Sequence, residues 1–164
     1  MKRVLAAWAV VVIVASIGTG VLIWRLAKTP PPKHPEISAY TDGQLARVGP
    51  YFYCNVLNLN ECDNPQTVGK LAVDRRHPVQ LSVPPAIGRA PWLLGRVYED
   101  SDVLEEFGPD STLAVTIPTV DPHRGKLTRI VVQLPTLVLD EEGNEQPSWH
   151  AEWSIETNWP QPAP

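Results

Sequence analysis

Apolar and polar residues alternate in Trp149-His150-Ala151-Glu152-Trp153-Ser154-Ile155. A period of two is typical of a β-strand that buries one face and exposes the other. We therefore expect the two tryptophans to point into a core and His150 to point to solvent. The same alternation recurs in residues 79–83, 112–117 and 130–134. Half-buried strands of this kind predict antiparallel sheets.

Further strand candidates lie between turn signals such as Asp42-Gly43 and His77-Pro78. They are Ile37–Thr41, Ala46–Val56, Lys70–Val73, Trp92–Tyr98 and Thr136–Leu139. About seven to nine short strands at this spacing predict an all-β fold, an immunoglobulin-like or fibronectin-like antiparallel β-sandwich. The one helical stretch expected in the domain is Ser101–Phe107, which Gly108-Pro109 would end.

The N-terminal region contains a run of 21 uncharged residues, Val4–Trp24. A helix of this length rises about 30 Å, the thickness of the hydrocarbon core of a bilayer. Basic residues flank the run, and it is longer than the apolar core of a removable secretory signal. We therefore predict a single transmembrane signal-anchor in residues 1–28. Cleavage near Gly18 or Gly20 is the alternative, and the sequence leaves it open.

The rest of the chain divides into three parts. Residues 29–35 are rich in proline and predict an extended polyproline II stalk. Residues 36–159 are numerous enough for one domain with its own core. Residues 160–164 form a Pro-rich tail that cannot build structure alone.

Charge and cysteine content indicate where the domain works. From Thr29 onward the chain carries ten basic and 18 acidic residues, a net charge of −8. Nucleic acid and anionic lipid headgroups repel such a domain, so we expect neither as its partner. The strand-rich patterning and the two cysteines favour a compartment in which disulfides persist. We therefore predict a single-pass protein of the cell membrane, with its C-terminal domain extracytoplasmic.

The two cysteines, Cys54 and Cys62, are separated by seven residues. In an oxidising compartment they should form a disulfide, which closes a small loop and contributes about 2–3 kcal/mol. A redox pair would need the shorter C-x-x-C spacing. A zinc site would need two further ligands nearby, and none is adjacent. We expect a structural disulfide and no metal or other cofactor.

Catalytic signatures are missing from the sequence. It contains no G-x-S-x-G, S-x-x-K or H-E-x-x-H motif and no phosphate-binding glycine loop. We therefore predict no catalytic residue and do not expect an enzyme. The acidic residues between positions 99 and 110 are expected to be a solvated loop, and calcium binding there stays open.

Six residues are candidates for contact with a partner. They are Arg75, Arg76, Arg89, Arg96, Trp92 and Trp159. The arginines are the only local basic features of an acidic domain, although isolated surface arginines usually bind nothing specific. The tryptophans are expected to pack in the sheets, and either one becomes an interface candidate only if it is exposed.

Besides the anchor and the stalk, four short segments carry a resemblance to a known family. They are Glu36-Ile37-Ser38-Ala39-Tyr40, Val48-Gly49-Pro50-Tyr51-Phe52-Tyr53-Cys54, Glu61-Cys62-Asp63, and Gln80–Pro85 leading to Ala90-Pro91-Trp92. Together they resemble an actinobacterial family of membrane-anchored cell-envelope proteins of unknown function. The resemblance covers nearly the whole chain. It implies an envelope location and a disulfide, and it implies no activity.

Three classes of function remain open. The leading one is a non-enzymatic interaction or scaffold module that binds another envelope protein, because β-sandwiches commonly serve recognition. The second is a carrier or sensor of a lipid, small molecule or metal, which would need a pocket between the sheets. A hydrolytic enzyme comes last, because its site would have to assemble from scattered residues.

Overall fold

The structure is a computed structural model that describes residues 2–27, 33–139 and 142–160. The chain forms two compact units, Met1–Lys33 and His34–Pro164. The second unit thus begins two residues before the predicted start of the domain. Most of the predicted stalk and most of the predicted tail lie outside the described residues.

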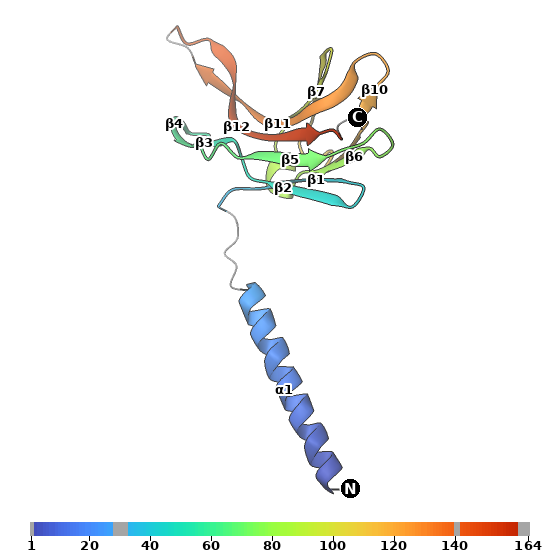
Figure 1. Ribbon diagram of the computed structural model, residues 1–164. Helices are drawn as coiled ribbons and strands as arrows, with labels where there is room; N and C mark the ends of the chain where they lie inside the picture. Colours follow the sequence, from blue (N-terminus) through green and yellow to red (C-terminus); the bar gives the residue numbers. More distant parts are fainter. Residues whose placement is uncertain (1, 28–32, 140–141, 161–164) are drawn as a thin grey trace. The chain divides into compact units, whose positions relative to one another are not determined.

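The N-terminal unit contains one helix, α1 (Lys2–Ala27) (Figure 1). Two hydroxyl side chains bond back to the preceding turn of this helix. Ser16 Oγ donates to the carbonyl of Val12 at 2.8 Å, and Thr19 Oγ1 donates to that of Ala15 at 2.9 Å. In the part of the chain that is described, no helix has both the length and the apolar character required to cross a bilayer. The predicted transmembrane helix is therefore not confirmed.

The smaller sheet of the second unit has the strand order β2-β1-β6-β9 and is antiparallel throughout. Its strands are β1 (Ile37–Thr41), β2 (Gln44–Val48), β6 (Val79–Ser82) and β9 (Ala114–Ile117). Asp42 and Gly43 join β1 to β2, with φ of 40° and 77°. Positive φ at both central residues is the turn that matches the twist of a two-residue hairpin. The predicted Asp-Gly turn is confirmed.

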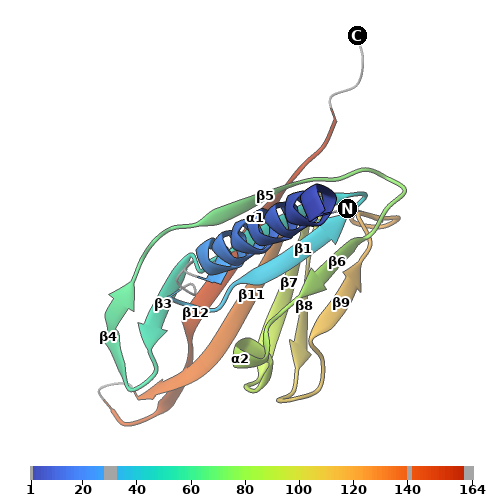
Figure 2. The same ribbon diagram turned by 90° about the horizontal axis from the view of Figure 1, so that it is seen from below.

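The larger sheet has the order β4-β3-β12-β11-β7-β8, with β10 paired to β11 and β5 paired in parallel to β12. Its strands are β3 (Phe52–Asn55), β4 (Asn58–Asp63), β5 (Val68–Ala72), β7 (Trp92–Tyr98), β8 (Asp102–Phe107), β10 (Val120–Asp121), β11 (Gly125–Leu139) and β12 (Glu145–Asn158). A short helix, α2 (Pro85–Gly88), follows β6. From below, the strands of the small sheet lie over those of the large one (Figure 2).

The core fills the space between the two sheets. Its largest fully buried side chains include Ile37 and Leu81 from the small sheet and Trp92, Ile130 and Trp153 from the large one. Each of these is at most 1 % exposed. The prediction of a mostly antiparallel, two-sheet β fold is confirmed.

Three details of the strand prediction are wrong. The described residues form 12 strands rather than seven to nine. Ala46–Val56 is not one strand, because the chain leaves the small sheet at Val48 and enters the large sheet at Phe52. Pro50 lies in this crossing, where its missing N–H removes no ladder bond. Residues 130–139 belong to one strand, β11.

The helix predicted at Ser101–Phe107 is also wrong, because residues 102–107 form the edge strand β8. This strand pairs with β7, and Trp92 stands opposite Phe107. Their rings stack with centroids 4.3 Å apart. Pairing with the preceding strand β7, from which only three residues separate it, outweighs the helix start and stop signals of this segment.

A β-bulge reverses the expected orientation of two residues in β12. Leu134 pairs with Ala151, but the next residue, Pro135, pairs with Trp149, so His150 is the extra residue. His150 is consequently buried, at 7 % exposure, whereas Trp149 is 38 % exposed. A one-residue slip moves side chains to the opposite face of a sheet. The predictions that Trp149 is buried and that His150 faces solvent are therefore wrong.

Candidate functional site

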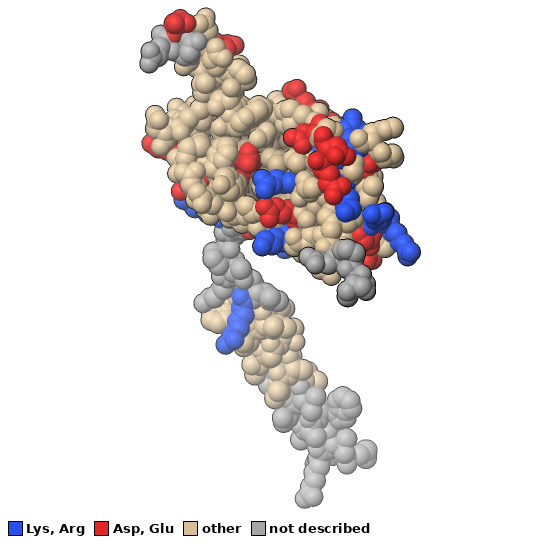
Figure 3. Space-filling view, turned by 45° about the horizontal axis from the view of Figure 1, so that its top comes forward, with Lys and Arg blue, Asp and Glu red and all other residues tan. Residues whose placement is uncertain are grey.

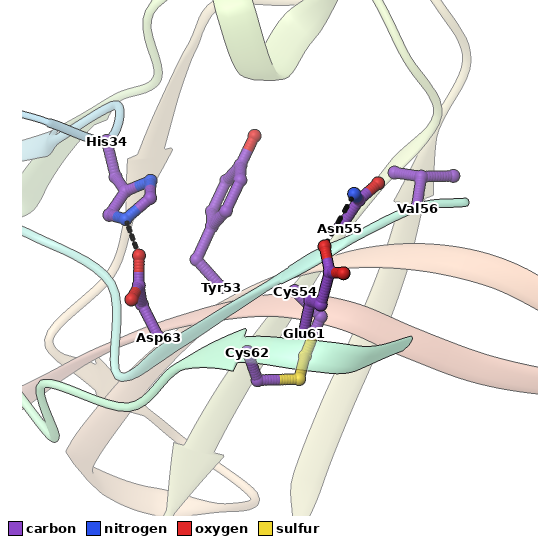
Figure 4. Close-up of a pocket in the computed structure, with 8 residues that line it drawn as sticks. All are labelled: His34, Tyr53, Cys54, Asn55, Val56, Glu61, Cys62 and Asp63. Carbon is purple, nitrogen blue, oxygen red and sulfur yellow. Dashed lines mark hydrogen bonds and ion pairs between the residues drawn. A yellow bond between two sulfur atoms is a disulfide. The ribbon is translucent and has the colours of Figure 1, made fainter. Parts of the chain in front are cut away.

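An open pocket of about 630 Å³ lies beside the hairpin formed by β3 and β4. The base of this hairpin is closed by the predicted disulfide between Cys54 and Cys62, which is confirmed. Figure 4 shows the Tyr53 ring between His34 on one side and the pair Asn55 and Glu61 on the other. The pocket is therefore built by one disulfide-bonded hairpin and by the first residue of the domain.

The wall formed by His34 is tied to the hairpin in two ways. His34 Nε2 lies 2.8 Å from Asp63 Oδ2. The His34 ring also stacks on Tyr53, with centroids 4.5 Å apart and planes 25° from parallel. Tyr53 in turn meets the buried Trp153 edge-on at 6.1 Å. His34, which the sequence placed in the stalk, is thereby connected to the core.

The opposite wall is a network of amides around one carboxylate. Glu61 accepts hydrogen bonds from Asn55 Nδ2 at 3.3 Å and from Asn58 Nδ2 at 3.0 Å. The side-chain oxygen of Asn55 accepts from the backbone N–H of Leu57 at 3.0 Å. These bonds fix the turn of the hairpin, Val56-Leu57, in one conformation.

The lining of the pocket combines an aromatic face with hydrogen-bonding groups. A histidine paired with an aspartate can act as a base in acyl transfer when a hydroxyl or thiol nucleophile is within reach. Among the described residues, no serine or threonine lines the pocket, its two cysteines are joined to each other, and its one hydroxyl is the phenol of Tyr53.

A second cluster joins Asp42, Asp74 and His77, whose potential ligand atoms lie within 4.8 Å of one another. Asp74 Oδ1 accepts from the backbone N–H groups of Arg76 and His77 at 2.6 and 2.9 Å, and Asp74 Oδ2 lies 2.7 Å from His77 Nδ1. The hydrogen bond from His77, followed by the backbone bonds, lowers the pKa of Asp74 to about 2. The hydrogen bond to Asp74 raises the pKa of His77.

Sequence reasoning missed this cluster, although it recognised both turns that supply it. Asp42 comes from the β1–β2 turn, and Asp74 and His77 come from the connection between β5 and β6. The two turns meet because β1 pairs with β6. All three side chains are substantially exposed, and Asp74 already accepts three hydrogen bonds. We assign the cluster to the stability of these turns.

The six predicted contact residues differ in how far they are exposed and in whether another residue holds them. Trp92 is 0 % exposed, as expected for a residue packed in the sheets, so the condition under which it would become a contact residue is not met. Trp159 packs against the core, and its Nε1 donates to the carbonyl of Leu127 at 2.8 Å. Arg96 is held by Glu105 at 2.6 Å. The remaining three are exposed: Arg75 and Arg76 are adjacent in the connection between β5 and β6, and Arg89 directly follows α2.

The acidic residues between positions 99 and 110 do not gather around one point. In β8, exposed Asp102 and Glu106 alternate with the less exposed Glu105, which pairs with Arg96. Glu99 accepts from the backbone N–H of Lys126 at 3.0 Å, which is the main cause of its lowered pKa. Among the described residues, Asp42, Asp74 and His77 are the one group with metal-ligand atoms this close.

Several exposed apolar side chains of the large sheet gather on a two-stranded extension. We call residues 135–139 and 145–149 the hairpin arm, because β7 pairs with β11 only up to Gln133 and β3 pairs with β12 only at residues 151 and 152. Figure 1 shows the arm projecting beyond the other strands. The sequence predicted a strand at Thr136–Leu139 but not at residues 145–148, and it did not predict that the two strands continue past their neighbours.

The arm carries its apolar side chains on one face. Cross-strand partners share a face, and the register pairs Pro135 with Trp149 and Leu137 with Pro147. Leu139, two residues further, lies on the same face. Leu137 and Leu139 are 63 % and 71 % exposed. Figure 3 shows the arm as an uncharged surface with acidic side chains toward its end.

These features define the chain as a two-sheet, mostly antiparallel β domain with a disulfide-bonded hairpin beside an open pocket. Residues 30–158 match the family described as protein of unknown function (DUF2771), and the chain belongs to this family. An uncharacterized protein of Mycobacterium bovis is 54 % identical over 158 residues, covering 94 % of this chain and 98 % of the relative. Uncharacterized proteins of two Mycobacterium tuberculosis strains match to the same extent. No solved structure matches.

The predicted resemblance to an actinobacterial family of unknown function is thus confirmed. The names of these relatives state no activity, ligand or partner. The membrane anchor, the envelope location and the interaction function therefore remain predictions.

Proposed function

We propose that this protein is a non-enzymatic interaction module of the cell envelope, anchored in the membrane by its N-terminal segment with the domain outside the cytoplasm. The domain would act in the manner of immunoglobulin-like and fibronectin-like sandwiches, which bind other proteins through strands and loops. The observation that carries the proposal is the apolar face of the hairpin arm.

The arm is unusual as part of a stable fold. A two-stranded hairpin without further sheet contacts is at best marginally stable in water. Yet Leu137, Leu139 and Trp149 expose apolar surface on one face of this arm instead of burying it. Exposed apolar surface that is gathered on one face marks an interaction site. We infer that a partner protein covers the apolar face of the arm.

Charge defines the chemistry of that partner. From Ile130 to the C-terminus the chain has six acidic residues and no lysine or arginine. Four of the acidic residues lie between positions 140 and 145, in the segment of the sequence that joins the two strands of the arm. Complementary potentials steer association and select partners. The partner that fits is a protein with an apolar strip next to a basic patch.

A carrier with a ligand between its sheets is less well supported. That space is occupied by core side chains such as Leu81, Leu94, Ile130 and Trp153, each at most 1 % exposed. A carrier needs a cavity of several hundred cubic ångströms at this position. The close-packed core supports recognition at the surface instead.

Site-specific photocrosslinking in the native membrane tests the proposal. A photoreactive amino acid replaces Leu137 in the full chain, and a matched variant carries it at Leu104 on the edge strand β8. The two positions are equally exposed, at 63 % and 62 %. We expect one protein to be captured from position 137 and not from position 104.

Two further variants decide whether the capture reflects the predicted chemistry. Leu139→Asp should abolish the crosslink at position 137, and Glu145→Lys should weaken it. The captured protein should carry a basic patch beside its crosslinked residue. Equal capture from both positions, or capture that survives both substitutions, would overturn the proposal.

A further inference from the structure

The turn of the disulfide-bonded hairpin exposes two apolar side chains. Asn55 pairs with Asn58 across the hairpin, so Val56 and Leu57 are the two turn residues. They are 54 % and 95 % exposed. Two-residue hairpin turns favour glycine, asparagine and aspartate at these positions. Neither turn chemistry nor packing within the domain accounts for a valine followed by a leucine.

The turn is also held rigidly in its exposed position. Glu61 bridges the amides of Asn55 and Asn58, and the disulfide between Cys54 and Cys62 closes the base of the hairpin. A side chain presented by a rigid element loses less conformational entropy on binding. The hairpin therefore presents Leu57 at a small entropic cost of binding.

The turn of the hairpin carries no charged residue, because residues 55–60 read Asn-Val-Leu-Asn-Leu-Asn. The nearest carboxylate, Glu61, accepts hydrogen bonds from the amides of Asn55 and Asn58, the residues that flank the turn. The region from Thr29 onward has a net charge of −8, which disfavours its approach to anionic headgroups. An uncharged, apolar turn whose neighbouring carboxylate is hydrogen-bonded within the hairpin is suited to enter the boundary between neutral headgroups and acyl chains.

The length of the covalent chain sets an upper limit on the distance between this hairpin and the N-terminal segment. His34 contacts the hairpin through Asp63 and Tyr53. Seven residue steps separate His34 from Ala27, the end of α1, and these steps span at most about 25 Å. Leu57 lies only four residues beyond Tyr53, which is about 13 Å along a strand. The turn is thus within reach of a bilayer that holds the N-terminal segment.

We propose that Val56 and Leu57 insert into the outer surface of the lipid bilayer and form a second membrane contact of the domain. The proposal depends on the membrane anchor of the proposed function. It does not depend on the hairpin arm or on its partner.

Fluorescence quenching on the full chain tests this proposal. An environment-sensitive fluorescent amino acid replaces Leu57, which leaves both cysteines paired, and a control carries it at Leu104. Each variant is reconstituted in phosphatidylcholine vesicles with or without nitroxide-labelled lipid, and flotation establishes that the protein is held by the bilayer. We expect quenching and a shift to shorter wavelength at position 57 and neither at position 104.

Each outcome decides a different point. If the protein does not float with the vesicles, the membrane anchor is refuted, and with it both the proposed function and this inference. Protein that floats without quenching at position 57 overturns the inference alone. A wavelength shift without quenching by labelled lipid shows that another protein surface, such as a second copy of the chain, covers the turn. That result also overturns the lipid contact.

Discussion

The indole Nε1 of Trp153 donates a 2.8 Å hydrogen bond to the backbone carbonyl of Pro35. Trp153 is 0 % exposed in β12, and Pro35 lies just before β1. The bond therefore fixes the first residues of the domain to one of its last strands. The neighbouring residue, His34, is held in turn by Asp63 and Tyr53.

Replacing Trp153→Phe should lower the free energy of unfolding by about 2–3 kcal/mol. Phenylalanine leaves the Pro35 carbonyl without its donor and creates a small cavity in the core. Trp149→Phe is the matched control, because Trp149 is 38 % exposed in the same strand, and it should change stability by less than about 0.5 kcal/mol. Urea unfolding of both variants measures the difference. Equal losses would contradict the role assigned to the buried indole.

The disulfide should stabilise the domain through the loop that it closes. Replacing both Cys54 and Cys62 by alanine should lower the free energy of unfolding by about 2–3 kcal/mol, the value expected for a loop of this length. Urea midpoints of the wild type and the double variant provide the measurement. Intact mass of protein from its native compartment should show a loss of two hydrogens. Free thiols in that material would refute the disulfide.

The local sequence was sufficient to predict features that depend only on neighbouring residues along the chain. Ile37–Thr41 and Trp92–Tyr98 were predicted with their observed bounds, because proline and turn residues mark where these apolar and aromatic segments begin and end. The turn at Asp42-Gly43 followed from its residue types alone. The pairing of Cys54 with Cys62 required only their short separation and an oxidising compartment.

Features that depend on a neighbouring strand could not be read from the sequence. The bulge at His150 arises where β12 changes register against β11. The residue types at this position do not predict that change. The edge strand β8 was taken for a helix because Ser101 and Gly108-Pro109 are typical helix start and stop signals, whereas pairing with β7 makes the segment a strand. Likewise, the candidate site needs His34 to fold back onto Asp63, 29 residues further along the chain.

Gly69 marks a place where the two sheets approach closely. A Cβ at this position would collide with Val48 Cγ2 and would lie 3.3 Å from Ile155 Cγ1. Gly69→Ala should therefore lower the free energy of unfolding by about 1–3 kcal/mol through overpacking. Gly108→Ala is the control, because no atom lies within 4 Å of its added Cβ. Thermal unfolding compares them, and an unchanged midpoint for Gly69→Ala would contradict this packing.

The ion pair of Asp74 and His77 should make stability depend on pH in two directions. The pKa of Asp74 falls from 3.8 to about 2, so its contribution is complete above pH 3.8 and is lost as pH falls toward 2. The pKa of His77 rises above 6.5, so its contribution is complete below pH 6.5 and is lost as pH rises through the raised value. Asp74→Asn should flatten both limbs of the unfolding free energy and return the NMR titration of His77 toward 6.5. The titration of His150, whose pKa burial lowers, should not move. An unaltered His77 titration in Asp74→Asn would show that Asp74 is not the cause of the raised pKa.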